Sequence, residues 1–521
     1  MSNRKLAKNI GSMSIAVFFS RISGLIRDIV MTSFFGTTYV ADAFQVGYQI
    51  PNLLRKLFGE GALSAAFIPI YNEIGINKGK KYQLGFALNV LSLLVSLLVI
   101  LCFLGIILAP VIVKILAPGF DDQTYRLTVK ISRILFPYLI FIGLSSTLIS
   151  ILNSHDFFFI PGLSSAFLNI GIVGSLGIYV LLKENSLLEN RIIYASIGVL
   201  CGGFLQVIIN FPLLKKIGYH LKINLHSRSE AIKSVWKRFL PGVAGLAIRQ
   251  VNLAVDLILA SLLATGSIAA LNYGNRLMQL PLGIFGVSAG VAVLPLYSKY
   301  FATEKWNELK ESLHFSIISL SFIMLPITAI IAGLGKDFIR LLFMRGAFNV
   351  DSLNMTYKAL LFYSLGLIFF SLNRLLIPIF YANKDTKTPV KISAFVVVLN
   401  IILNIILMQF MQHAGLAFAT TISAIIHFFV LKHFLKKKIP QLIFPRIFFE
   451  INKILILSAL LFTGLCLAGN LFLPTNFWST IVRIAIFIFL SIVFFFLGSQ
   501  ILQIKFSKQI ITKLWQRFHK K

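Results

Sequence analysis

The chain has 521 residues, of which 57% are hydrophobic and only 13% are charged, and its mean hydropathy is +0.85. This composition exposes too much apolar surface for a water-soluble globular protein and indicates a polytopic membrane protein. The formal net charge of +31 is accompanied by no nucleic-acid recognition motif. We therefore attribute the charge to membrane topology and expect no nucleic-acid partner.

The apolar runs are long enough to cross about 30 Å of hydrocarbon as helices. A helix satisfies its own backbone in lipid, whereas an open strand cannot, so the fold class expected is an all-α polytopic membrane protein. Hydropathy, with turn residues as boundaries, predicts about 14 transmembrane helices. Their limits are 10–35, 39–73, 83–117, 124–154, 160–183, 191–215, 233–263, 267–300, 306–335, 353–384, 389–411, 414–437, 451–472 and 478–503.

The first span is interpreted as a retained helix and not as a signal peptide. Arg21, Arg27 and Asp28 interrupt its apolar run, and no small-residue cleavage site follows. Arg21 and Arg27 are six residues apart and therefore lie on different sectors of an ideal helix. Asp28 is placed to pair with Arg27 or with a cation of another helix.

Further cations interrupt later spans. Asp42, Arg55 and Lys56 fall in the second span, where Pro51 removes a backbone donor and favours a kink. The other intramembrane cations are Arg249, Arg276 and Arg374. A charge at this depth costs at least about 2.5 kcal/mol, so each of these cations should face a wet cavity, a partner or a substrate.

The distribution of Lys and Arg predicts the orientation. With the N-terminus inside, the inner connections carry 31 of these residues and the outer connections only seven. The bias favours both termini in the cytoplasm. Four more cations, Lys130, Arg133, Lys358 and Arg483, lie near outer helix ends, where we expect them to snorkel toward the interface.

Three short motifs recur at offsets of 226 to 228 residues, which indicates an internal duplication. Leu116–Phe120 is echoed at Met344–Phe348, the run from Asn153 to Pro161 at Asn383 to Pro389, and Ile68–Tyr71 at Leu294–Tyr297. We expect two six-helix lobes related by a pseudo-two-fold axis along the membrane normal, as in transporters that rock two halves about a central site. The expected parts are a lobe at 1–216, a cytoplasmic linker at 217–238, a lobe at 239–438, and two extra helices with a basic tail at 439–521.

A cavity lined by Arg21, Arg27, Arg55, Lys56 and Arg276 would suit an anion with several charges, and a diphosphate fits the planar fork of donors that Arg presents. The alternative is that these cations pair with Asp28, Asp42, Glu60 or helix C-termini and only hold the bundle together. Cations outnumber the intramembrane acids, which favours a binding role for the set as a whole.

The three cysteines and eight histidines show no metal-ligand spacing. We therefore expect no metal site and no cofactor. Acidic residues number only 18 and are scattered, which argues against an integral-membrane glycosyltransferase or lipid phosphatase, so we expect a transporter and not an enzyme.

Several motifs resemble the MurJ (MviN) lipid II flippases of the multidrug/oligosaccharidyl-lipid/polysaccharide exporter superfamily. They run in order over about 400 residues, and both the length and the span count fit that family. The matching motifs lie at Phe19–Asp28, Ala41–Phe44, Pro51–Phe67, Ala117–Phe120, Asn272–Met278, Phe380–Pro389 and His413–Leu416.

The resemblance implies a flippase of the bacterial inner membrane that moves lipid II, the undecaprenyl-diphosphate-linked disaccharide-pentapeptide of peptidoglycan and cell-wall synthesis, to the outer leaflet by alternating access. It implies that the two C-terminal helices form a groove for the lipid tail. The substrate-binding residues that it implies are Arg21, Arg27, Asp42, Asn52, Arg55, Lys56 and Arg276.

Coupling to Na+ or to the membrane potential is also implied by the resemblance, and Asn252 and Asp256, at i and i+4 of the seventh span, are the ion-site residues it suggests. We expect a monomer whose partners are lipid II, membrane lipids and the cell-wall synthesis machinery. The alternatives are an exporter of another undecaprenyl-linked glycan and a drug exporter, although a pocket for organic cations should present acids. Arg249 and Arg374 remain unassigned.

Overall fold

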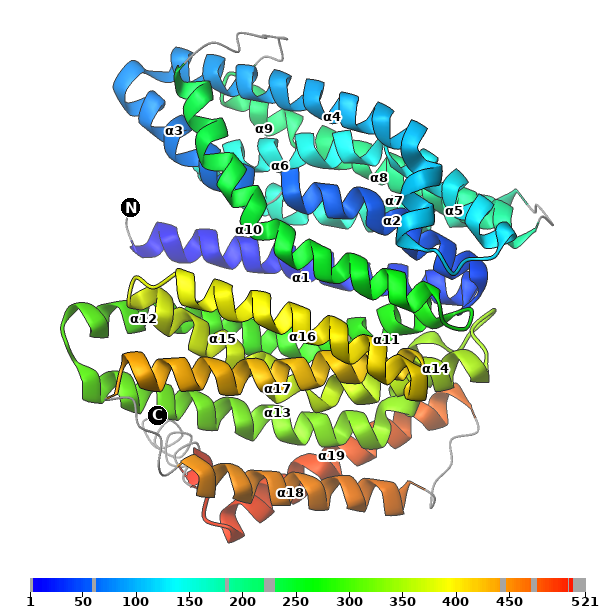
Figure 1. Cartoon of the computed structure of the whole chain (residues 1–521), viewed down its shortest axis with the longest axis vertical. Coiled ribbons are helices and arrows are strands. Elements are labelled where there is room, and N and C mark those ends of the chain that lie inside the picture. The colour runs from blue at the N-terminus through cyan, green and yellow to red at the C-terminus, as the bar shows by residue number, and fades with distance from the viewer. Residues whose placement is uncertain are drawn as a thin grey trace. The chain divides into compact units, whose positions relative to one another are not determined.

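A computed structural model of the chain describes residues 3–58, 62–182, 187–219, 230–440, 447–469, 476–504 and 506–508. Every long regular element within these residues is a helix (Figure 1). The all-α fold expected from hydropathy is therefore confirmed. The side chains of Lys56 and Arg249 lie outside this description, as does the whole of Glu60.

The helices divide into two compact units. One unit comprises Met1–Ala269 with Gly346–Phe348, and the other comprises Ala270–Arg345 with Asn349–Lys521. The helices of the first unit are α1 (Asn3–Phe35), α2 (Tyr39–Phe58), α3 (Ala62–Lys78), α4 (Lys80–Leu116), α5 (Asp122–Leu135), α6 (Tyr138–Ser154), α7 (Phe159–Leu181), α8 (Leu188–Ile208), α9 (Phe211–Lys216) and α10 (Glu230–Ser261).

The helix α11 (Ser267–Pro281) begins at the boundary between the units. It is followed in the second unit by the π-helix η1 (Leu282–Val287), α12 (Ser288–Ala302), α13 (Trp306–Phe343), α14 (Val350–Leu365), α15 (Leu367–Ala382), α16 (Lys387–Met411), α17 (His413–Lys438), α18 (Ile447–Ala468) and α19 (Phe477–Ile501). In the first unit, α10 packs on α2, α3 and α4. The two units are defined by contacts within the structure, whereas the two expected lobes are defined by the sequence repeat. The boundaries of the lobes therefore stay a prediction.

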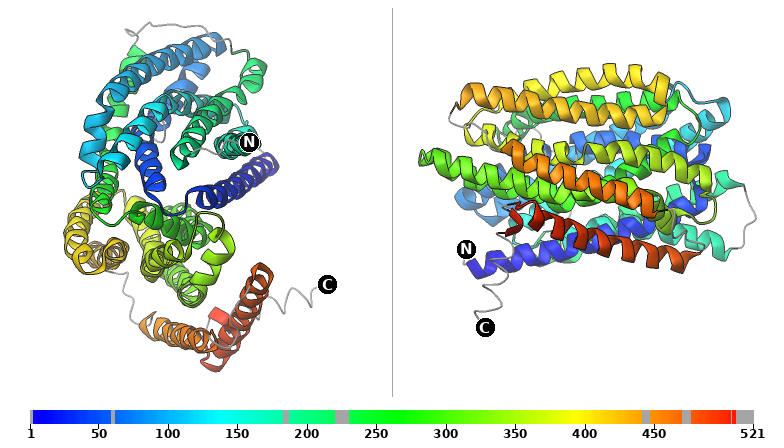
Figure 2. Two further views of the ribbon diagram at one scale, coloured as in Figure 1. Left: turned by 90° about the vertical axis from the view of Figure 1, so that its right-hand side faces the viewer. Right: turned by 90° about the horizontal axis from the view of Figure 1, so that it is seen from below.

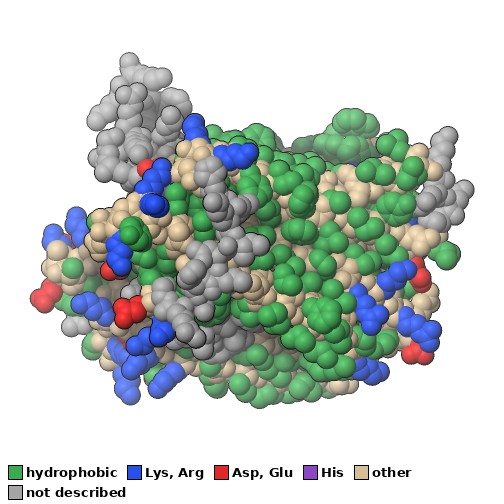
Figure 3. Space-filling view, turned by 90° about the horizontal axis from the view of Figure 1, so that it is seen from above, with side chains coloured by type: hydrophobic (Ala, Val, Ile, Leu, Met, Phe, Trp, Pro, Cys, Tyr) green, Lys and Arg blue, Asp and Glu red, His purple; other side chains and the backbone are tan. Residues whose placement is uncertain are grey.

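Ten stretches of the described chain are long and apolar enough to cross a membrane, or eleven if the bent pair α14 and α15 counts as one span. This supports an integral membrane protein, while the count of about 14 spans stays a prediction. Apolar side chains of α4 such as Phe103 and Ile107, and of α16 such as Phe395 and Phe410, are exposed. Figure 3 shows apolar side chains across the middle of one face, with Lys and Arg gathered toward its two ends, as a lipid-facing surface requires.

Four of the expected continuous spans contain a break within the described residues. Pro137 and Phe136 separate α5 from α6, Pro281 precedes the π-helix η1, two turn residues separate α8 from α9, and the chain bends by 42° between α14 and α15 at Gly366. Proline removes a backbone donor and clashes with the preceding turn, which explains the first two breaks. The helix α2 nevertheless continues through Pro51.

The turns that follow α6 and α15 have the same geometry, which supports the duplication. Asp156 (φ 65°) and Lys384 (φ 57°) both take the left-handed conformation, 228 positions apart. In each turn the residue after the left-handed one donates its amide to a carbonyl five positions earlier in the preceding helix. Phe157 donates to Leu152 at 3.0 Å, and Asp385 donates to Phe380 at 2.8 Å. The two buried tyrosines of the repeated motif, Tyr71 and Tyr297, are both fully inaccessible.

Candidate functional site

Arg27 lies at a polar seam between α1 and α7 in the first unit. Its Nη2 and Nε donate to Oδ1 of Asp28 at 2.6 and 3.1 Å, and its Nη1 donates to Oδ1 of Asn169 at 3.0 Å. The side chains of Arg27 and Asp28 are only 14% and 13% exposed. The pairing of Arg27 with its neighbour Asp28, one of the alternatives expected from the sequence, is confirmed.

Asn169 ties this seam together. Its amide nitrogen donates to Ser23 Oγ at 2.9 Å and to the carbonyl of Ser20 at 3.5 Å, both on α1. One amide group therefore accepts from the cation and donates to the helix that carries it. Because three of the five N–H groups of Arg27 are used, two remain without a partner among the described residues and can bind an anion.

Arg21 lies on the same helix but in a different environment. Its side chain is exposed, and it pairs with no acidic group of the described chain. The difference between exposed Arg21 and largely buried Arg27 agrees with the prediction that they occupy different sectors of α1. One of the two cations is held in place and the other is accessible.

Two predicted binding residues of α2 lie near one another in sequence and are partly or fully buried. Arg55 is half-buried, and Asn52 is only 8% exposed. The Oδ1 atom of Asn52 has no hydrogen-bond partner among the described residues. A buried amide oxygen in this state is available to a ligand or to water, since leaving it unpaired is costly.

Asp42, also expected to bind substrate, lies at the N-terminus of α11. Its Oδ2 accepts from the backbone N–H of Gly266 at 2.5 Å and its Oδ1 from that of Ala269 at 2.8 Å. The carboxylate is only 3% exposed. It therefore satisfies amide groups at the start of a helix, where a negative charge is favoured.

The remaining predicted cations belong to the second unit. Arg276 on α11 and Arg374 on α15 are both exposed. The expected receptor that combines both lobes stays a prediction.

The residues suggested for an ion site lie together on α10. The Nδ2 atom of Asn252 donates to Oδ2 of Asp256 at 3.2 Å, and both side chains are half-buried. The expected shared face is therefore present. An ion bound there stays a prediction.

One expectation about a cation is wrong. Arg483 was expected to snorkel at a helix end, but it is 7% exposed and its Nε pairs with Oδ2 of Asp337 at 2.9 Å. A neutralising partner on another helix makes burial of the guanidinium tolerable where exposure to lipid would not be.

Sequence reasoning also missed buried amides on the inner faces of helices. Asn169 is one. In the second unit, Asn400 donates to Ser423 at 3.2 Å and Asn404 donates to Asn400 at 3.2 Å. The signal available in the sequence was an uncharged polar residue within an apolar span, which is expensive in lipid unless it is bonded.

The amino-acid sequence is similar to a known protein family and to individual members of it. A family model described as lipid II flippase MurJ matches residues 31–489. The chain is 34% identical over 428 residues to a probable lipid II flippase MurJ of Buchnera aphidicola, with 82% of each chain covered. It is 30% identical over 425 residues to the lipid II flippase MurJ of Burkholderia cenocepacia, with 80% of this chain and 81% of that one covered.

Solved structures agree with these relatives. A structure of lipid II flippase MurJ in an inward closed conformation matches with a TM-score of 0.78 and 29% identity, covering 94% of this chain and 99% of that one. An inward-facing multidrug resistance MATE transporter of the MOP superfamily matches with a TM-score of 0.64 at 15% identity, covering 83% and 99%, which shows a shared fold. The chain is an integral membrane protein that belongs to the lipid II flippase MurJ family.

Proposed function

We propose that the chain is a lipid II flippase that carries the undecaprenyl-diphosphate-linked precursor of peptidoglycan from the inner to the outer leaflet of the cytoplasmic membrane. The observation that carries the proposal is Arg27, a cation within a membrane helix that is oriented by Asp28 and Asn169 and keeps N–H groups for an anion. Family membership supports the same substrate class.

The diphosphate is the part of the substrate that most needs help in crossing the hydrocarbon, because its charges cannot be desolvated without a partner. Arg21, Arg27, Arg55, Lys56 and Arg276 supply donors and positive charge for it, and Asn52 supplies an unpartnered polar oxygen for the attached sugars or for water. Arg binds phosphate oxygens with two parallel N–H groups, which fixes orientation as well as charge.

Transport proceeds by alternating access between two lobes and breaks no covalent bond. The headgroup is taken from the cytoplasmic side while the prenyl tail remains in lipid against α18 and α19. Rocking of the lobes then opens the headgroup site to the outer side. Both termini lie in the cytoplasm, and Asn252 with Asp256 is a site at which Na+ would couple transport to the ion gradient.

Two alternatives share this architecture. An exporter of another undecaprenyl-linked glycan would use the same cations for the same diphosphate. A drug exporter for organic cations would need acids facing its cavity, and the carboxylates of Asp28 and Asp42 are already engaged, by Arg27 and by the start of α11.

The test replaces one cation in each unit. Arg27→Ala and Arg276→Ala should each reduce translocation of labelled lipid II at least about tenfold, because each removes charge-assisted hydrogen bonds of about 1.5–3 kcal/mol, while membrane insertion and yield stay normal. The control is Arg133→Ala, an exposed cation of α5 whose Nε donates to the Ile106 carbonyl at 3.3 Å. Full activity of both Arg27→Ala and Arg276→Ala in cells that depend on this protein would rule out the assignment.

A further inference from the structure

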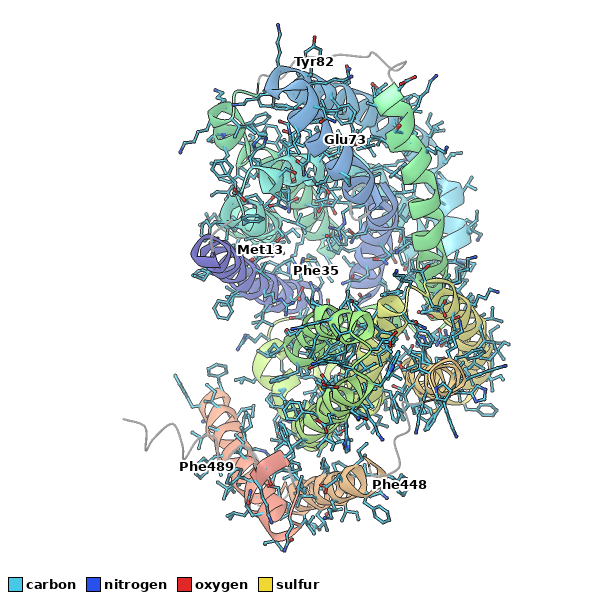
Figure 4. All side chains as sticks on the ribbon, turned by 90° about the vertical axis from the view of Figure 1, so that its left-hand side faces the viewer. Met13, Phe35, Glu73, Tyr82, Phe448 and Phe489 are labelled. Atoms are coloured by element: carbon cyan, nitrogen blue, oxygen red, sulfur yellow. The ribbon has the colours of Figure 1, made fainter. Side chains whose placement is uncertain are left out.

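Within the described residues, the two C-terminal helices pack on the rest of the second unit mainly through one long helix, α13. Both α18 and α19 pack against α13 and against each other. On their far side, Phe448 of α18 and Phe489 of α19 are 68% and 65% exposed and point away from the bundle (Figure 4). Figure 2 shows the pair from two further directions. The placement of the pair therefore depends on what it contacts on α13.

At one end, where α13 finishes and α19 starts, the contact is ionic. Arg483 of α19 and Asp337 of α13 form a pair at 2.9 Å, and each side chain is 7% exposed. The Nη1 atom of Arg483 also donates to the carbonyl of Gly469, just beyond the end of α18, at 2.9 Å. One guanidinium therefore joins α13, α18 and α19.

Toward the other end, α19 and its following segment belong to one apolar cluster with α13, which includes aromatic pairs. Phe322 of α13 lies 5.0 Å from Phe495 and 5.2 Å from Phe506 between ring centroids, and Phe315 lies 5.6 Å from Phe506. In a bilayer such contacts are readily exchanged for contacts with lipid tails, which are equally apolar. An ion pair has no such substitute, because separated charges would be left in hydrocarbon.

We infer that Arg483 and Asp337 are positioning residues that anchor the α18–α19 pair on α13 and thereby set where the prenyl tail of the substrate is received. This inference rests on the proposed function, because it takes the prenyl tail of the substrate to lie against the α18–α19 pair. The anchor holds one end of the pair by charge, whereas the other end is held by apolar contacts that an apolar chain can replace.

The surroundings of the anchor make the two residues unequal. Arg340, which is 40% exposed, has its Nη1 3.9 Å from Oδ1 of Asp337. Asp337 therefore keeps a nearby cation when Arg483 is neutralised. When Asp337 is neutralised, Arg483 loses this carboxylate and retains the uncharged Gly469 carbonyl and the ring of Phe487, whose centroid is 5.4 Å from the guanidinium carbon. The change Asp337→Asn should be the more harmful of the two.

The transport test compares two substrates in vesicles that contain the full-length protein, lipid II with its natural tail and lipid II with a shortened prenyl tail. Asp337→Asn should slow the natural substrate at least about tenfold and the short-tailed one little, because breaking a buried pair leaves an uncompensated charge. The double variant Asp337→Asn/Arg483→Gln should recover to within about threefold of wild type, since both charges are then gone. Glu308→Gln breaks an exposed pair of the same helix, with Lys305 at 3.6 Å, and should change nothing.

A second measurement does not depend on transport. Spin labels at Lys310 on α13 and Ile501 on α19, both exposed, in a variant without native cysteines, should give one narrow distance distribution that broadens in Asp337→Asn and narrows again in the double variant. Equal loss of both substrates with an unchanged distance distribution would overturn the anchor. Failure of the wild type to move either substrate would instead refute the proposed function, and the distance measurement would still decide on the anchor.

Discussion

Asn169 on α7 accepts a hydrogen bond at 3.0 Å from the guanidinium of Arg27 on α1, across 142 positions of sequence. The same amide donates to Ser23 Oγ at 2.9 Å. Asp28 accepts from only one side of the guanidinium, so the bond to Asn169 fixes the plane of the guanidinium group. The direction in which the free N–H groups of Arg27 point is therefore set by a residue of another helix.

Replacing Asn169 by Leu should reduce lipid II translocation about tenfold, because loss of a hydrogen bond to a charged group costs about 1.5–3 kcal/mol and leaves Arg27 free to turn. The measurement is the translocation rate per folded molecule in vesicles. Asn373→Leu is the matched control, since Asn373 is equally buried, at 6% exposed, and donates to the Ala424 carbonyl at 3.0 Å. Equal losses in the two variants would show that any buried amide is needed, and would contradict a specific role for Asn169.

Asp42 should act through the start of α11. Asp42→Ala leaves the backbone amides of Gly266 and Ala269 without their acceptor and should destabilise the protein by about 1–2 kcal/mol, as for loss of an N-terminal cap. Asp42→Asn keeps one acceptor oxygen and should cost less. Thermal unfolding in detergent measures both. An unchanged melting temperature in Asp42→Ala would mean that the carboxylate serves the substrate and not the helix.

Gly266 should not tolerate a side chain. Its φ is +89°, and a Cβ there would lie 2.2 Å from the carbonyl oxygen of Thr37. Gly79 has a similar φ of +83° but no atom within 4 Å of a Cβ. Both alanine variants carry the left-handed penalty of about 1–2 kcal/mol, so the larger loss of thermal stability expected in Gly266→Ala isolates the steric clash. Equal losses would show that the backbone relieves the clash by moving.

The turn after α6 should make stability depend on pH. His155 Nε2 hydrogen-bonds the Tyr71 hydroxyl at 2.8 Å, and burial, with a smaller effect of Lys80 and partly opposed by Asp156, lowers the pKa of His155 below its ordinary 6.5. The unfolded chain then takes up a proton before the folded protein does. Stability should therefore be unaffected by this group above pH 6.5 and should fall as the pH drops below it toward the lowered pKa.

The comparison that isolates this effect is wild type against His155→Gln. Their melting temperatures should differ by a constant amount from pH 7 to 8, and the wild type should lose more stability between pH 6.5 and 5.5. Parallel curves for the two proteins over that interval would show that His155 does not titrate differently in the folded state.

Hydropathy was enough to predict helices, because lipid cannot satisfy the backbone groups of an open strand or a loop. Hydropathy could not predict at which prolines a helix is interrupted. Pro137 separates two helices and Pro281 precedes a π-helix, whereas α2 continues through Pro51 and α13 through Pro326. The outcome depends on which neighbouring groups satisfy the freed carbonyl, and those neighbours are set by packing.

The candidate site was predictable to the extent that its contacts are local. Arg27 and Asp28 are adjacent in sequence, and Asn252 and Asp256 are one helical turn apart, so both pairs followed from the sequence. Two other contacts join residues that are far apart in sequence. Arg27 and Asn169 are 142 positions apart, and Asp337 and Arg483 are 146 positions apart. Because Arg483 lies near the end of its span, the sequence suggested that its side chain reaches the membrane interface. Only the packing of α19 on α13 shows that its partner is Asp337.

The central claim is that the chain moves lipid II between leaflets, and leaflet movement in vesicles tests it most directly. The purified protein is reconstituted, and labelled lipid II is compared with a different undecaprenyl-linked glycan, with and without a Na+ gradient or a membrane potential. The account predicts movement of lipid II that exceeds that of the other glycan and is lost in Arg27→Ala. Lipid II movement no faster than in protein-free vesicles under every gradient would contradict it.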